Sequence, residues 1–131
     1  MTQIVSLDEI RIRFGIGTPR RQFLFRQLTL VSAQLASTGS LKQLYLFGSF
    51  VTGKAVPNDI DLFGVMSAGF STDQLFGGIL DVFRHDVCRI RYHADVFWVT
   101  EAVGADQIKD LLEIFSRDRD GRDQPVFEVT P

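Results

Sequence analysis

Residues 47–62 read FGSFVTGKAVPNDIDL, and they say more about the architecture than any other part of the chain. The apolar run that ends at Gly48 predicts a buried strand followed by a tight turn at the edge of a sheet. Gly48 lets the backbone approach a ligand closely, and Ser49 adds a hydroxyl and an N–H group at the start of a short helical turn, where anions are favoured. Asp59 and Asp61 follow on a second predicted strand. We therefore expect a phosphate-holding turn beside a pair of carboxylates.

The side chains of Asp59 and Asp61 should point to one face of that strand, because strand side chains alternate, while Ile60 and Leu62 point to the core. Two ionised carboxylates whose Cα atoms are about 6 to 7 Å apart repel each other, so the pKa of one should rise unless a cation is bound. Oxygen-only ligands suit Mg²⁺ or Mn²⁺. The pair therefore predicts a divalent metal site, and a site with two ions roughly 3.5 to 4 Å apart calls for a third carboxylate.

Asp95 is the candidate for that third carboxylate. It lies in the sequence HADVFWV, residues 93–99, which is rich in aromatic and β-branched residues and reads as a strand. Its alternation predicts that His93, Asp95 and Phe97 share one face. An Asp in so apolar a segment is costly to bury without a cation or hydrogen-bond donors. A shared metal site would supply the cation, and backbone donors at a strand end are the alternative.

A Gly-Ser turn, an Asp-x-Asp pair and a third Asp on a later strand together resemble the signature of the DNA polymerase β-like nucleotidyltransferase superfamily, in particular its minimal nucleotidyltransferases. The resemblance implies that Gly48 and Ser49 contact a triphosphate and that Asp59, Asp61 and Asp95 hold two Mg²⁺ ions, with Asp95 as third ligand or general base. It also implies transfer of a nucleoside monophosphate, AMP from ATP being the expected case, to a hydroxyl group with release of pyrophosphate.

Two positions depart from the pattern of the minimal members. Thr52 stands where they commonly carry Arg, although the following Gly53 agrees, and Asn58 stands where Ser often precedes the Asp pair. Lys54 is a candidate to bring positive charge to the phosphates, but its ammonium group lacks the bidentate fork of a guanidinium. The alternative for Lys54 is a solvated loop charge.

The resemblance also bears on partners. Larger relatives add a second domain that grips the acceptor, and this chain has no room for one, so we expect a macromolecular acceptor or a site completed by homo-oligomerisation. Minimal nucleotidyltransferases resemble the antitoxin halves of toxin–antitoxin modules whose partner is a HEPN-type nuclease. Two alternatives stay open: a catalytically weak or inactive binding module that neutralises a partner protein by masking it, and, less favoured, an antibiotic-modifying enzyme.

Composition limits the class of protein. A chain of 131 residues with 45% hydrophobic content predicts a single domain over residues 1–131. The net charge of −2 gives no basic field for nucleic-acid binding. A single cysteine, Cys88, and the lack of a leader or a membrane-spanning run predict a cytoplasmic protein. Gly53-Lys54 is followed by Ala55, which disfavours a P-loop nucleotide hydrolase.

The remaining elements predict an α/β (α+β) fold, with a small mixed sheet flanked by helices and a helical segment over residues 6–38. Ser6 with Glu9, and Thr18 with Pro19, mark two helix starts. Arg20, Arg21 and Arg26 are expected on the polar side of the second helix. The predicted helices are 6–14, 18–37, 71–83 and 105–115, and the predicted strands are 43–47, 60–66, 93–99 and 126–129.

Overall fold

The computed structural model describes residues 2–130 and contains one mixed sheet of five strands in the order β1-β5-β2-β3-β4. The predicted class, a small mixed sheet flanked by helices, is confirmed. The strands are β1 (Gln3–Ser6), β2 (Leu41–Phe47), β3 (Ile60–Met66), β4 (Ala94–Thr100) and β5 (Phe127–Thr130). The helices are α1 (Leu7–Phe14), α2 (Pro19–Ser37), α3 (Gly77–Phe83), α4 (His85–Tyr92) and α5 (Ala105–Phe115), with short 3₁₀ turns η1 (Ser49–Val51) and η2 (Glu101–Val103).

The register of the central strands determines where the acidic residues lie. β2 and β3 are antiparallel and pair Phe47 with Asp61, whereas β3 and β4 are parallel and pair Asp61 with Asp95. Directly paired residues present their side chains on the same face of a sheet. Both aspartates are the second residue of their strands, so the parallel arrangement brings them to the same edge and the same face.

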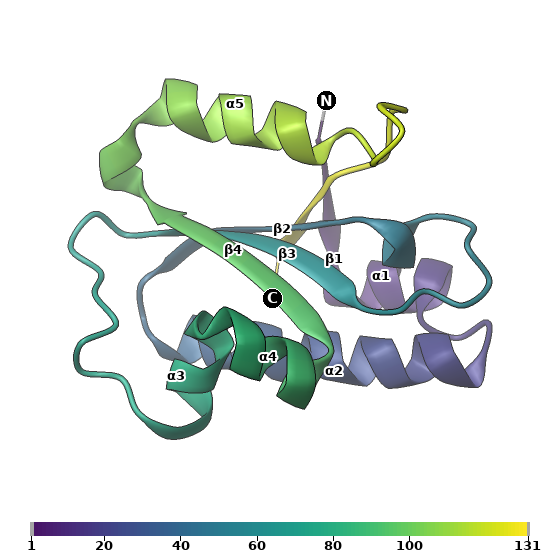
Figure 1. The fold of residues 1–131 in the computed structure, drawn as a ribbon, viewed down its shortest axis with the longest axis horizontal. Helices are drawn as coiled ribbons and strands as arrows, with labels where there is room; N and C mark the ends of the chain where they lie inside the picture. Colours follow the sequence, from purple (N-terminus) through teal and green to yellow (C-terminus); the bar gives the residue numbers. More distant parts are fainter. Residues whose placement is uncertain (1, 131) are drawn as a thin grey trace.

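The sheet is covered unequally on its two faces (Figure 1). Helix α5 lies on one face, where Ile108, Leu111 and Phe115 pack against an aromatic cluster that includes Phe47 and Phe63. Within residues 2–130, α1, α2, α3 and α4 cover the other face and contribute to the larger core. Ile60 and Leu62 are fully buried there, as the alternation of β3 predicted. Among these residues, no helix combines the length and the apolar character that crossing a bilayer requires.

The predicted helix starts at Ser6 and Thr18 are confirmed. The Ser6 hydroxyl accepts a hydrogen bond from the Glu9 N–H at 3.1 Å, and the Thr18 hydroxyl accepts one from the Arg21 N–H at 3.1 Å. Pro19 occupies the first turn of α2, where its missing N–H group costs nothing. These caps set the position of α2, and α2 in turn contacts the loop that precedes the acidic residues.

The predicted helix 71–83 begins only at Gly77. The Ser71 hydroxyl accepts a hydrogen bond from the Asp73 N–H, and the Leu75 N–H donates to the Thr72 carbonyl, so these residues form local turns instead of a helix start. Phe76, the residue before Gly77, is 83% exposed. Side-chain hydrogen bonds thus satisfy the backbone locally and delay the helix by about one and a half turns.

Helix α4 and strand β1 were not predicted. α4 follows α3 after the single residue Arg84 and is short and highly charged, so its sequence gives little helical periodicity. His93 forms the C-cap of α4 with φ of +52°, and its ring packs edge-on against Phe23 of α2 at 5.0 Å. The expectation that His93 shares a face with Asp95 is therefore wrong, because His93 ends a helix and precedes β4.

Candidate functional site

Three carboxylates meet at one end of the parallel pair β3 and β4. Asp59 ends the loop before β3, Asp61 lies in β3, and Asp95 lies in β4. Each has a carboxylate oxygen within 4.8 Å of the corresponding oxygens of the other two. Asp95 is buried at 7% exposure, whereas Asp59 and Asp61 are half-buried. The cluster therefore lies at the surface with one wall in the core, and it consists of hard oxygen donors.

The electrostatics of the cluster show an excess of negative charge. Burial first, and then the charges of Asp59 and Asp95, raise the pKa of Asp61 to about 7. Burial and the charge of Asp95 also raise the pKa of Asp59. The cations Arg89 and Arg119 oppose both shifts without cancelling them. A divalent cation would relieve this repulsion, and the all-carboxylate donor set suits Mg²⁺ or Mn²⁺.

Gly48 is fitted to this cluster by its lack of a side chain. Its φ is +84°, a conformation that side-chain-bearing residues rarely adopt, and a Cβ atom at this position would lie 2.1 Å from Oδ2 of Asp61. Ser49 follows as the first residue of η1, which confirms the predicted short helical turn. The backbone of Gly48 therefore lies close to the Asp61 carboxylate, whereas the sequence predicted that it would lie close to a ligand.

Asp95 has two further neighbours, both on α4. The Arg89 guanidinium donates from Nε to Asp95 Oδ1 at 2.9 Å, and this hydrogen bond raises the pKa of Arg89. Nε2 of His85 lies 3.5 Å from the same oxygen. Neither residue was predicted from the sequence, because α4 was not predicted. Their spacing of four residues on a charged segment was the one available signal, since it places them on one face of a helix.

The loop between η1 and Asp59 is held by two arginines of α2. Arg21 is 8% exposed and donates to the carbonyl groups of Phe50 at 2.6 Å, Thr52 at 2.8 Å and Lys54 at 2.5 Å. Arg20 donates to the Pro57 carbonyl at 3.1 Å and to the Asn58 carbonyl. The placement of Arg21 on the polar, solvated side of the helix was wrong: its charge is buried among backbone carbonyls.

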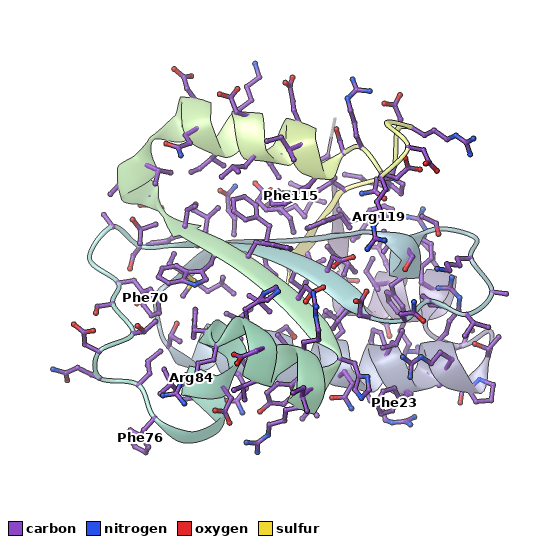
Figure 2. All side chains as sticks on the ribbon, viewed as in Figure 1. Phe23, Phe70, Phe76, Arg84, Phe115 and Arg119 are labelled. Atoms are coloured by element: carbon purple, nitrogen blue, oxygen red, sulfur yellow. The ribbon has the colours of Figure 1, made fainter. Side chains whose placement is uncertain are left out.

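Lys54 and Thr52 lie on the outer part of the same loop. Lys54 is exposed and lines a cavity together with Arg13 and Arg21, away from the carboxylates, although its charge still lowers the pKa of Asp59. The Thr52 hydroxyl donates to the Ser49 carbonyl at 2.8 Å and so closes η1. Arg119 lies in the loop that follows α5 (Figure 2), and its positive charge lowers the pKa of Asp61.

Comparisons with known proteins place the chain in a family. A crystal structure named "putative nucleotidyltransferase" from Sulfolobus solfataricus is similar at a TM-score of 0.42 and 20% sequence identity, over 96% of this chain and 89% of that one. Comparison with curated proteins gives no significant match. The family model DUF6932, described as a family of unknown function, matches residues 3–129. Since this match covers nearly the whole sequence, the chain belongs to the DUF6932 family.

Proposed function

We propose that the protein is a Mg²⁺- or Mn²⁺-dependent nucleotidyltransferase of the DNA polymerase β-like type. One observation carries the proposal: carboxylate oxygens of Asp59, Asp61 and Asp95 lie within 4.8 Å of one another. They do so on a sheet edge directly beside the Gly48-Ser49 turn. The three residues come from a loop and two strands, and a chance surface cluster would not need Gly48 at φ of +84° to fit against it.

The donors fit the proposed ions by charge and by type. The raised pKa values of Asp59 and Asp61 show that the folded protein disfavours their ionised forms, and a bound cation would favour them. A bound divalent ion would polarise phosphate oxygens and favour displacement of pyrophosphate. Asp59 and Asp61 are the proposed ligands. Asp95 is the proposed third ligand or the group that accepts the proton of the attacking hydroxyl.

Phosphate binding is assigned to the groups around the carboxylates. Backbone N–H groups at Gly48 and Ser49 open η1, and such positions favour anions. Arg89 and Arg119 are exposed and lie close enough to influence the pKa of Asp61 from two sides. Their guanidinium groups suit phosphate oxygens. We assign to them the phosphate binding that an arginine at the position of Thr52 would otherwise provide.

The proposed donor is ATP and the proposed acceptor is a hydroxyl group on another macromolecule. Asp59, Arg89 and His85 are all accessible to solvent at the same edge of the sheet, so a protein surface has room to reach the site. A HEPN-type toxin encoded beside this protein is the proposed partner, and a second copy of the chain is the alternative that completes the site.

The test measures nucleotide transfer as an increase in intact mass, which labels the acceptor. The protein is co-expressed with the product of the adjacent gene, and intact masses of both are measured with and without the double variant Asp59→Asn/Asp61→Asn. A mass increase of one nucleotide on either protein, lost in the double variant, is the expected result. Asp73→Asn/Asp110→Asn, which makes the same charge change at exposed positions, should keep the transfer. Equal labelling in both double variants would refute the assignment.

A binding module is the second candidate, because Asp95 is already neutralised within the protein by Arg89. In that case the chain inhibits a partner by covering it and needs no nucleotide. The two functions separate in a neutralisation assay: Asp59→Asn/Asp61→Asn should abolish protection of cells from the partner if transfer is required, and should preserve it if masking suffices.

A further inference from the structure

The cavity lined by Arg13, Arg21 and Lys54 lies beside the loop that follows the Gly-Ser turn. It has a volume of about 520 Å³ and is formed by the end of α1, the start of α2, loop residues 51–55 and the start of β5. Asp59, Asp61 and Asp95 do not line it. Arg13 and Lys54 on its rim are exposed, so the cavity opens to solvent. Its size falls within the range of small-molecule sites.

The charges around this cavity have one sign. Arg13, Arg21 and Lys54 line it, and no Asp or Glu is among its described lining residues. Arg21 is 8% exposed, yet its hydrogen bonds go to neutral carbonyl groups and it has no carboxylate partner within residues 2–130. In the same part of the chain, neither the Arg13 guanidinium nor the Lys54 ammonium group has a hydrogen-bond or ion-pair partner. Three positive charges therefore face one cavity without a counter-ion.

Two other features of the cavity favour a phosphate-bearing ligand. Gly17 and Thr18 on its wall form the N-terminal end of the 19-residue helix α2, where the helix dipole adds positive potential. The Arg13 guanidinium lies over the buried ring of Phe127, 4.9 Å from the ring centroid, and this contact holds its charge at the wall of the cavity. A positioned guanidinium and a helix N-terminus both favour the oxygens of a phosphate group.

The cavity and the carboxylate cluster lie on different sides of the sheet. Val51 and Phe127 belong to the core between the sheet and α1 and α2. Asp61 shares the face of its paired residue Phe47, which packs under α5. The loop that carries Ser49 on one side and Lys54 on the other separates the two sites.

We propose that this cavity is a second anion site that binds a small phosphate-bearing molecule, either a nucleotide or free pyrophosphate. Arg13 and Lys54 contact the phosphates, and Arg21 and the start of α2 supply fixed positive potential. The site does not depend on the carboxylates or on a metal, so it stands independently of the proposed transferase activity.

The experiment titrates the metal-free protein, in EDTA, with ADP and with pyrophosphate while amide chemical shifts are followed by NMR. Saturable shifts at Gly17, Thr18 and Gly53 are expected, and Asp59→Asn/Asp61→Asn should leave them unchanged. Arg13→Gln should weaken binding about tenfold, since one charge-assisted hydrogen bond is lost, and Arg13→Gln/Lys54→Gln should weaken it further. Tighter binding of ADP than of pyrophosphate identifies a nucleotide, and equal binding identifies the phosphates alone.

Arg26→Gln/Lys42→Gln, which removes the same charge outside the cavity, is the matched control and should bind like the unmodified protein. If this control loses as much affinity as Arg13→Gln/Lys54→Gln, the loss is explained by net charge alone and the proposal is overturned. The proposal also fails if neither ligand binds saturably at millimolar concentration, or if the shifts lie at Gly48 and Asp95 instead. Tighter binding of a single-stranded oligonucleotide with shifts spread over the surface would replace the small-molecule site with a nucleic-acid surface.

Discussion

Asp61 is a proposed metal ligand, and its burial beside two other carboxylates destabilises its ionised form. Its pKa is raised to about 7, first by burial and then by Asp59 and Asp95. The folded protein therefore holds this proton more tightly than the unfolded chain, whose Asp ionises near pH 4. Between these two values unfolding releases the proton, so the free energy of unfolding decreases as the pH rises.

The first prediction follows from this sign. In EDTA, Asp61→Asn should be more stable than the unmodified protein, and the difference should grow by about 2 to 3 kcal/mol between about pH 5 and about pH 7. Above about pH 8 it should be constant, because the aspartate is then ionised in both states. Urea unfolding at a series of pH values measures the difference, and a difference independent of pH would show that Asp61 is not held protonated.

Gly48 gives the second prediction at the scale of one residue. Gly48→Ala places a Cβ atom against the Asp61 carboxylate in a backbone conformation that disfavours side chains. We expect a loss of about 2 kcal/mol or more in the free energy of unfolding and a loss of metal binding. Gly53→Ala, in the same loop with no atom within 4 Å of its added Cβ, should change neither. Equal effects of the two substitutions, by calorimetry, would contradict this account of Gly48.

At the scale of elements, α2 and the loop over residues 50–58 form one unit. The guanidinium of Arg21 donates hydrogen bonds to the carbonyl groups of Phe50, Thr52 and Lys54. Arg20 donates to the carbonyl group of Pro57, two residues before Asp59. A long helix with capped ends is rigid, so its arginines fix both ends of an irregular loop. The position of Asp59 thus depends on a helix that is distant in sequence.

The third prediction tests this dependence. Arg21→Leu removes the donor from the buried carbonyl group of Phe50 and from the partly buried carbonyl groups of Thr52 and Lys54, and it should lower the free energy of unfolding by about 3 kcal/mol. It should also increase amide hydrogen exchange at residues 50–55 more than elsewhere, because the loop loses its anchor. Arg26→Leu, at an exposed position of the same helix, is the control. If both variants exchange alike, Arg21 does not hold the loop.

At the scale of the whole molecule, the carboxylate cluster lowers the free energy of unfolding of the metal-free protein but supplies the ligands of the proposed metal site. The sheet packs α5 on one face and the other helices on the opposite face, and the cluster sits where the parallel strands β3 and β4 begin beside the open edge. A cation that binds only the folded state returns the lost stability through mass action.

The fourth prediction is therefore a metal-dependent melting temperature. Mn²⁺ at about a hundred times its dissociation constant should add about 2.7 kcal/mol, which for 131 residues corresponds to roughly 10 °C. EDTA should reverse the shift, and Asp59→Asn/Asp61→Asn should remove it. K⁺ at matched ionic strength is the control. A melting temperature that does not respond to Mn²⁺ or Mg²⁺ would leave the carboxylates without a metal.

Local sequence determined the elements whose signals are local. Apolar alternation placed Ile60 and Leu62 in the core, the caps at Ser6 and Thr18 set two helix starts, and the glycine before Ser49 predicted the turn. The three aspartates were identified as candidates from local signals too: Asp59 and Asp61 by their spacing after the Gly-Ser turn, and Asp95 as an acidic residue in an apolar segment. These features depend on backbone sterics, hydrogen bonding over a few residues and the cost of burying charge.

Only the tertiary structure decided which distant groups surround those aspartates. Arg89 and His85 reach Asp95 because α4 packs beside β4, and Arg21 is buried because the loop folds over the start of α2. His93 left the predicted strand because the preceding helix ends on it in a left-handed conformation. Contacts between segments far apart in the chain depend on packing of the whole core, and that packing leaves no periodic trace in the local sequence.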